Sequence, residues 1–247
     1  GGNLALPSLT SVTSKERNKM VKIFLDSADL AEMGRYATQV DGLTTNPTLM
    51  RKAGVADYKA FALEAISLGK PVSLEVFADD HDEMERQAQV IASWGENVYV
   101  KIPITYTNGI FTTELIQSLW KQNIKVNVTA IMTRLQINRL CDSHGFGRRP
   151  IIVSIFAGRI ADAGSDPEIL FNYAHMRYGH IKGPEYLWAS TREIANLKQA
   201  KNCNADIITL SPDLIAKLPL HGKDLAEYSL ETVKMFRSDA LAAGYMI

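Results

Sequence analysis

The sequence predicts an α/β protein whose fold is a single (β/α)8 TIM barrel. Short β-rich runs recur at nearly even spacing, and each is followed by a stretch with helical periodicity, which is typical of repeated βα units around a parallel sheet. Eight such units within about 225 residues match a closed barrel. The alternative is an open doubly wound sheet, which is disfavoured because no Gly-rich dinucleotide turn follows the first run.

The candidate strands are apolar runs separated by helix signals. The runs are VKIFLD (21–26), GLTTN (42–46), VSLEV (72–76), VYVKI (98–102), KVNVT (125–129), IIVSIF (151–156), EYLWAS (185–190) and DIITLS (206–211). The clearest helices are expected over residues 58–68, 81–94, 110–122 and 229–243. Asp29, Thr133 and Asp213 are the expected N-caps of others.

Composition indicates one soluble domain with a small substrate. The chain has 247 residues, of which 46% are hydrophobic, and this is enough for one barrel core, although length alone also allows two small domains. Lys+Arg and Asp+Glu each number 27, so no net charge attracts the protein to nucleic acid or to an anionic membrane. No apolar run reaches the roughly 18–20 residues of a membrane helix.

We expect the barrel domain to span residues 20–247. Residues 1–19 start with Gly-Gly and lack the layout of a signal peptide, so they are interpreted as a loose extension or a cloning remnant. Cys141 and Cys203 lie far apart in no metal-binding or redox spacing, which favours a reducing compartment, the cytoplasm.

The residues that end the candidate strands are unusually polar. In a (β/α)8 barrel the active site lies at the C-terminal ends of the strands, so these side chains are expected to meet at one mouth. They are Asp26, Thr45, Asn46, Glu75, Lys101, Thr129, Ser154 with Arg159 after it, and Ser190.

Lys101 is the candidate nucleophile. It ends the apolar run VYV and precedes Ile102 and Pro103, where an ammonium group is expected to lose hydration. Desolvation lowers the pKa of a lysine and supplies the neutral amine that attacks a carbonyl. The alternative is a lysine that only extends to solvent, which its polar neighbours disfavour.

Two carboxylates and a threonine accompany this lysine. Asp26 could take a proton from a substrate hydroxyl and return one, or it could cap the following helix. Glu75 stands between apolar neighbours, where a carboxylate needs a buried partner or a function. Glu75 and Thr129 could together hold a water.

Arg159, Ser190 and Arg192 are the candidates for binding an anionic group. Ser190 and Arg192 are expected at a helix start, where backbone N–H groups, a hydroxyl and guanidinium groups make a phosphate site. The alternative pairs Arg159 with Asp162 and Arg192 with a neighbouring carboxylate such as Glu193.

These stretches resemble the transaldolase family, including its short members close to fructose-6-phosphate aldolase. The resemblance follows the strands in order through FLDSAD (24–29), GLTTNPTL (42–49), SLEV (73–76), VKIP (100–103), NVTA (127–130), SIFAGRIADAG (154–164), WASTRE (188–193) and IITLSPDLI (207–215). TTNP together with VKIP is a specific signal. The family implies a barrel of the class I aldolase type, with the lysine on strand four rather than on strand six, where other class I barrel aldolases usually carry it.

The resemblance implies transfer of a dihydroxyacetone unit from a ketose phosphate, such as fructose 6-phosphate or sedoheptulose 7-phosphate, to an aldose phosphate. No metal or organic cofactor is expected, because an iminium is the electron sink and the histidines show no HxH or HExxH spacing. The implied roles are Lys101 as Schiff-base former, Asp26 as general acid/base, Asn46 as hydroxyl ligand, Glu75 and Thr129 as holders of the catalytic water, Thr45, Ser154 and Phe156 as substrate-site residues, and Arg159, Ser190 and Arg192 as phosphate ligands.

Two positions bear on the choice between subfamilies. Aldolase-type members tend to carry Gln where this chain has Glu75 and Tyr where it has Phe156, so both residues favour a transaldolase over a direct aldolase. A barrel that binds a sugar phosphate without catalysis is a third possibility. Trp188, Ala157 and Ala130 differ from the common family pattern.

The resemblance also implies self-association. Short members of the family are often ring-built decamers, so a homo-oligomer is expected, and the apolar segment 228–247 could supply contacts between subunits.

Overall fold

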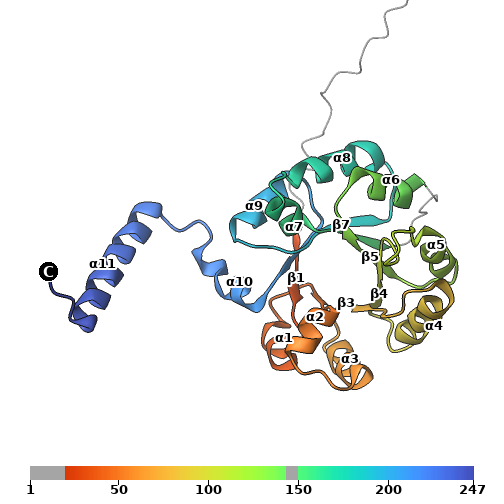
Figure 1. The fold of residues 1–247 in the computed structure, drawn as a ribbon, viewed down its shortest axis with the longest axis horizontal. Helices are drawn as coiled ribbons and strands as arrows, with labels where there is room; N and C mark the ends of the chain where they lie inside the picture. The colour runs from red at the N-terminus through yellow and green to blue at the C-terminus, as the bar shows by residue number, and fades with distance from the viewer. Residues whose placement is uncertain (1–19, 143–149) are drawn as a thin grey trace, which may run out of the picture.

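The computed structural model describes residues 20–142 and 150–247, and its strands form a closed parallel barrel (Figure 1). Each strand pairs with the next in sequence, and β8 pairs with β1. The strands are β1 (Lys22–Asp26), β2 (Gly42–Thr44), β3 (Val72–Glu75), β4 (Val98–Pro103), β5 (Val126–Ile131), β6 (Ile151–Ile155), β7 (Pro184–Trp188) and β8 (Ile207–Leu210). The predicted TIM barrel is confirmed, and the open doubly wound alternative is wrong.

Helices surround this barrel on its outside (Figure 1). They are α1 (Leu30–Tyr36), α2 (Pro47–Lys52), α3 (Tyr58–Ser67), α4 (His81–Ala92), α5 (Thr113–Lys121), α6 (Arg134–Asp142), α7 (Ala157–Asp162), α8 (Glu168–Tyr178), α9 (Ala195–Asn202), α10 (Pro212–Ala216), the 3₁₀ turn η2 (Leu218–Leu220) and α11 (Leu225–Ala243). The last of these, α11, is the exception, because it does not cover the barrel.

Side-chain caps set several helix starts. Asp29 and Thr133 accept hydrogen bonds from the first turns of α1 and α6, as predicted. Asp213 is not a cap, and that prediction is wrong. Ser211 caps α10 instead, because Pro212 occupies the first helical position, where no N–H is needed.

The helix predicted over residues 110–122 begins later than expected, at Thr113. Phe111 forms an antiparallel bridge with Thr105, so the residues after β4 fold back as a loop before α5 starts. The apolar residues Ile110 and Phe111 of this loop fit the helical spacing of the residues that follow, so the sequence pattern does not show where the loop ends.

The strands carry two apolar layers, one on each face of the sheet. Outward side chains such as Val128, Val153 and Ile155 join the large core beneath the helices. Inward side chains, including Phe24, Ile152, Leu187, Ala189 and Ile207, form a smaller cluster inside the barrel.

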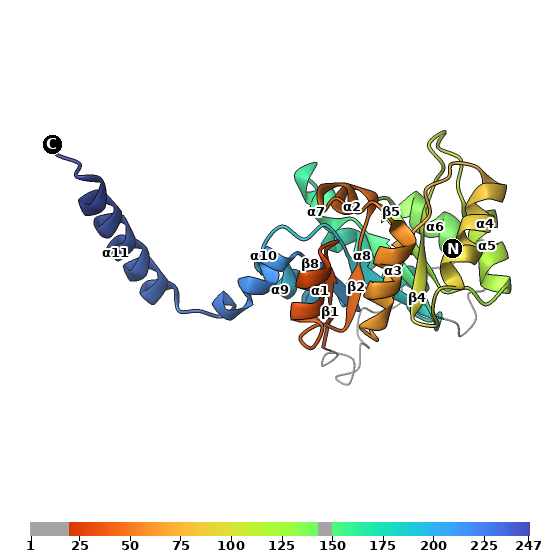
Figure 2. The same ribbon diagram turned by 90° about the horizontal axis from the view of Figure 1, so that it is seen from below.

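Helix α11 extends away from the barrel (Figures 1 and 2). None of its residues is buried. Its exposed apolar side chains include Leu225, Tyr228, Leu230, Val233, Met235, Phe236 and Leu241. The predicted C-terminal helix is confirmed and begins earlier than expected, but it lacks the tertiary packing that normally stabilises an isolated helix.

One expectation falls on residues that the structure does not describe, because the predicted extension over residues 1–19 lies outside the described ranges. Within the described ranges, no helix has the length and apolarity needed to cross a bilayer.

Candidate active site

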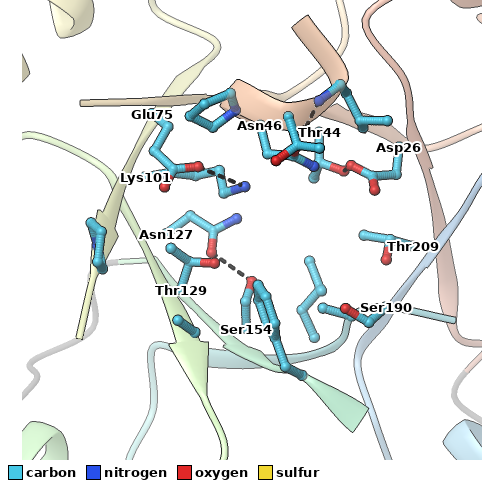
Figure 3. Close-up of a pocket in the computed structure, with 18 of the residues that line it drawn as sticks. Asp26, Thr44, Asn46, Glu75, Lys101, Asn127, Thr129, Ser154, Ser190 and Thr209 are labelled. Atoms are coloured by element: carbon cyan, nitrogen blue, oxygen red, sulfur yellow. Dashed lines mark hydrogen bonds and ion pairs between the residues drawn. The ribbon is translucent and has the colours of Figure 1, made fainter. Parts of the chain in front are cut away.

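A cavity of about 400 Å³ opens at the C-terminal ends of the strands (Figure 3). Its lining includes Asp26, Thr44, Asn46, Glu75, Lys101, Asn127, Thr129, Ala130, Ser154, Phe156, Arg159, Ser190 and Thr209. Leu187 and Ala189 also line it and belong to the apolar cluster inside the barrel. The structure therefore brings most of the predicted strand-end side chains together over a partly nonpolar floor.

Lys101 projects into this cavity from β4. It is only 6% exposed, and its Nζ donates a hydrogen bond to the carbonyl of Thr45 at 2.8 Å. The same nitrogen lies 3.3 Å from Oε2 of Glu75. Glu75 ends β3 directly opposite Lys101 in the β3–β4 register, so strand pairing itself brings the two charges together.

Asp26 ends β1 and lies across the cavity from Lys101 (Figure 3). Burial raises the pKa of Asp26 above its ordinary value, while the charge of Lys101 and a hydrogen bond from Thr44 lower it. The Thr44 hydroxyl donates to Oδ1 at 2.9 Å. The alternative role of Asp26 as a helix cap is wrong, because Asp29 caps α1.

The TTNP segment contributes different atoms from its successive residues. Thr44 supplies the hydroxyl to Asp26, and Thr45 supplies its carbonyl to Lys101. The Thr45 side chain is fully buried and is not part of the described cavity lining. Asn46 accepts from the N–H of Leu49 through Oδ1 at 3.0 Å and caps α2, so its amide nitrogen is the group left to donate at the cavity.

A hydrogen-bonded chain of buried polar side chains links β3, β5 and β6. Ser154 donates to Oδ1 of Asn127 at 2.6 Å, and Nδ2 of Asn127 donates to Ser73 at 3.0 Å. Asn127 stands beside Lys101 in the β4–β5 register. Ser154 was predicted as a site residue, whereas Asn127 was missed, although a fully buried amide within an apolar strand was a usable signal.

Thr129 lines the cavity from β5 and is 3% exposed. Its hydroxyl is buried without a hydrogen-bond partner among the described residues. A buried hydroxyl in this condition favours a bound water.

Arg159 and Ser190 lie on the cavity rim where α7 meets the end of β7. The N–H of Gly158 donates to the carbonyl of Ala189 at 3.2 Å. A Cβ at Gly158 would stand 1.7 Å from the carbonyl oxygen of Ser190. Only glycine permits this close approach, which brings the next residue, Arg159, to the same rim as Ser190.

Arg192 lies outside this lining with an exposed side chain. It pairs with Asp162 of α7, so the alternative pairing with Glu193 is wrong. The helix predicted to begin near Ser190 begins only at Ala195, and Ser190 itself has a left-handed backbone with φ of 59°. A phosphate site here would rest on side chains rather than on a helix N-terminus.

Two aromatic residues that the sequence singled out point in opposite directions. Phe156 lines the cavity and packs on the inner apolar cluster. Trp188 faces outward and stacks on Phe171 with ring centroids 5.3 Å apart, so its bulk does not narrow the cavity.

The cavity thus offers an amine, two carboxylates and several hydroxyl and amide groups, which are the components of covalent carbonyl chemistry with proton transfer. In the described ranges, no group of three or more His, Cys, Asp or Glu side chains is arranged to hold a metal ion.

Solved structures share the fold at low sequence identity. A putative lyase/mutase from Burkholderia cenocepacia gives a TM-score of 0.55 at 11% identity and covers 94% of this chain and 87% of that one. The 3-hexulose-6-phosphate synthase of Salmonella typhimurium gives a TM-score of 0.53 at 16% identity and covers 77% and 89%. Similarity at these identities shows the fold alone.

Curated relatives are more similar in sequence. A probable transaldolase of Maridesulfovibrio salexigens is 33% identical over 223 residues, which cover 87% of this chain and 99% of that protein. Probable transaldolase 2 of Listeria monocytogenes is 35% identical over 205 residues, which cover 81% and 89%. The family model for transaldolase/fructose-6-phosphate aldolase matches residues 23–246. The chain therefore belongs to the transaldolase/fructose-6-phosphate aldolase family.

Proposed function

We propose that the protein is a transaldolase that moves a dihydroxyacetone unit from fructose 6-phosphate or sedoheptulose 7-phosphate to an aldose phosphate. The observation that carries this proposal is the buried contact of Lys101 Nζ with Glu75 in a cavity that also holds Asp26. Schiff-base cleavage needs an amine, a proton acceptor beside it and a second acid/base group farther along the substrate.

The first stage forms the iminium. Glu75, at 3.3 Å from Nζ, accepts the ammonium proton, and the neutral nitrogen of Lys101 attacks C2 of the ketose. The carbonyl oxygen gains one proton from the attacking nitrogen and a second from protonated Glu75, and it leaves as water when the nitrogen lone pair forms the C=N bond. A water held between Glu75 and the unpartnered Thr129 hydroxyl moves these protons.

The second stage breaks the C3–C4 bond. The Asp26 carboxylate takes the proton of the C4 hydroxyl, the bond electrons flow into the iminium, and the aldose phosphate leaves with C4 as its aldehyde. A dihydroxyacetone enamine remains on Lys101, and an acceptor aldehyde reverses the sequence. The positions of Asp26 and Lys101 on opposite sides of the cavity (Figure 3) suit a substrate chain that lies between them.

The remaining polar groups bind substrate in this proposal. Asn46 donates its amide to a substrate hydroxyl, and Ser154 lines the site beside Asn127. Arg159 and Ser190 on the rim bind the phosphate, and Arg192 adds charge from the outer side of the same rim. Thr45 acts through its carbonyl rather than through its side chain.

Direct aldol cleavage is the second candidate, and Phe156 disfavours it. Release of free dihydroxyacetone requires protonation of the enamine, which a tyrosine hydroxyl at this place would assist through a water. Phe156 faces the cavity without a hydroxyl, so the enamine should wait for an acceptor aldehyde.

Borohydride trapping with fructose 6-phosphate tests the nucleophile. We expect a reduced three-carbon adduct on Lys101 by peptide mass mapping. Lys101→Arg should give no adduct and keep its thermal stability to within about 1 kcal/mol, whereas Lys121→Arg, at an exposed position of α5, should trap like wild type. An adduct on another lysine, or none in wild type, would contradict the proposal.

Acceptor dependence then separates the two activities. With fructose 6-phosphate alone, a transaldolase should release one equivalent of glyceraldehyde 3-phosphate and stop until erythrose 4-phosphate is added. Continued turnover without an acceptor would identify an aldolase.

We also propose that the enzyme is a cytoplasmic homo-oligomer. Cys141 and Cys203 are both free and buried, which suits a reducing compartment. Helix α11 has no buried residue and exposes apolar side chains such as Tyr228, Val233 and Phe236, and a second copy of the chain is the partner that is always present to cover them.

A further inference from the structure

Strand β5 contains a bulge at the cavity. Its pairing with β6 is regular up to Val128 and resumes at Ile131 with a shift in register. Two residues of β5, Thr129 and Ala130, therefore stand opposite a single residue of β6, Ser154, which defines a β-bulge.

The bulge reverses which side chains of β5 face the barrel interior. Val128 points outward into the large core, and Asn127 and Thr129 line the cavity. Simple alternation would turn Ile131 inward. Instead, Ile131 is fully buried in the outer core, and Ala130 lines the cavity.

Ala130 sustains this bulge with a left-handed backbone. Its φ is 64°, a conformation that L side chains rarely adopt. Among the described residues, Asn123 and Asn204 share this conformation in turns, where asparagine tolerates it, whereas Ala130 and Ser190 both line the cavity. Strained residues of this kind persist where their surroundings impose the conformation, and they cluster at functional sites.

Neighbouring strands hold the bulge from both sides. The N–H of Ile104 on the β4 side donates to the carbonyl of Thr129 at 3.0 Å, and the N–H of Phe156 on the β6 side donates to the carbonyl of Ile131 at 2.8 Å. Ala130 lies between these two bonds. Its backbone conformation therefore fixes the peptide group that follows Thr129 and turns the side chains after it, while Thr129 itself faces inward by strand alternation.

We propose that Ala130 is a positioning residue for the proton relay, because its left-handed bulge fixes the peptide group that follows Thr129 and keeps Ile131 out of the space beside the Thr129 hydroxyl, where the water shared with Glu75 would lie. The role rests on the proposed Schiff-base function. It leaves room for that water at the Thr129 hydroxyl, which is buried and unpartnered among the described residues. It also explains why a residue without a polar atom in its side chain is held in a costly conformation there.

A matched pair of substitutions tests the backbone role. Valine and asparagine are similar in size, but a β-branched residue resists positive φ whereas asparagine tolerates it. We expect Ala130→Val to lower kcat at least about fivefold more than Ala130→Asn, since small misplacements of reacting groups cost large factors in rate. KM for fructose 6-phosphate should be similar in the two variants, because steric filling of the cavity is common to both.

Two further measurements separate positioning from general damage. Asn123→Val introduces the same strain in the exposed turn between α5 and β5 and should lower thermal stability without changing kcat. In a Thr129→Val background, Ala130→Val should cause no further loss of kcat, because the group through which it acts is already gone. If Ala130→Val does not fold, Ala130→Met, which is unbranched at Cβ, replaces it in each comparison.

Equal kcat for the Val and Asn variants, or a full additional loss in the Thr129→Val background, would overturn the role of Ala130. Wild-type protein is trapped with borohydride in parallel. A normal wild-type adduct together with either of those results refutes the positioning role alone, whereas no adduct on wild-type Lys101 refutes the proposed function and this role with it.

Discussion

Side chains of opposite charge lie close together in the cavity, where they are shielded from bulk water. Lys101, 6% exposed, contacts Glu75 at 3.3 Å, and Asp26 faces the same lysine from β1 (Figure 3). An amine nucleophile must first lose a proton, and a carboxylate in contact with it provides an acceptor without any backbone movement. In the proposed mechanism the two carboxylates therefore have separate tasks, Glu75 at the nitrogen and Asp26 at the bond to be broken.

The hydrogen bond from Thr44 affects the pKa of Asp26. Burial raises the pKa of Asp26, and the hydrogen bond from Thr44 opposes that rise. Thr44→Val removes the opposing contribution, so the pKa of Asp26 should rise further. Because cleavage needs the ionised carboxylate, the decline of the cleavage rate at low pH (the acid limb of the pH profile) should move to higher pH.

Single-turnover cleavage of fructose 6-phosphate as a function of pH measures this shift. Thr209→Val removes another hydroxyl of the same cavity, one that donates to the carbonyl of Trp188 rather than to Asp26, and should leave the pH dependence of cleavage unchanged. A Thr44→Val profile that coincides with wild type would show that Asp26 does not control cleavage.

The junction between α7 and the end of β7 forms one side of the cavity rim. Because α7 follows β6 directly and packs its second residue, Gly158, against the carbonyl oxygen of Ser190, two segments distant in sequence present Arg159 and Ser190 together. Arg192 then reaches back from the other segment to Asp162 of α7, which ties the two parts of the rim by a second contact.

Gly158→Ala should break this junction. A Cβ at 1.7 Å from the Ser190 oxygen forces the helix and strand apart, so we expect a loss of about 1–3 kcal/mol in unfolding free energy and a higher KM for the phosphorylated donor. Gly34→Ala on α1, where nothing lies within 4 Å of the added Cβ, should stabilise the protein by up to about 1 kcal/mol. Equal stability of the Gly158→Ala variant and wild type would contradict the close approach.

The barrel and the meeting of Asp26, Glu75 and Lys101 were predictable from the sequence. Strand period and polar strand ends are local signals, and parallel pairing in a closed barrel brings the strand ends to one mouth. The features that could not be predicted from the sequence depend on how distant parts of the chain meet. The partner of Arg192 lies on another helix, and the left-handed residues Ala130 and Ser190 interrupt regular structure at places where the local pattern predicts continuity.

Substitutions on α11 test whether this helix holds copies of the chain together. Val233→Glu combined with Phe236→Lys places charges on apolar, exposed positions without changing net charge, so we expect a smaller assembly by light scattering because charges are costly in an apolar contact. Lys234→Glu combined with Asp239→Lys is the control on the same helix. An unchanged mass for the first pair would exclude α11 from the interface.

Closure of the sheet has a consequence for how copies of this chain can associate. Every strand of the barrel has a hydrogen-bonded neighbour on both sides, so there is no edge strand whose free N–H and C=O groups could recruit a strand from another chain. Strand addition and edge-to-edge aggregation of the folded barrel are therefore blocked. Copies of the barrel must therefore associate through side chains. Their affinity for one another will increase with the apolar area that they bury, and it will change with temperature and salt as apolar burial does.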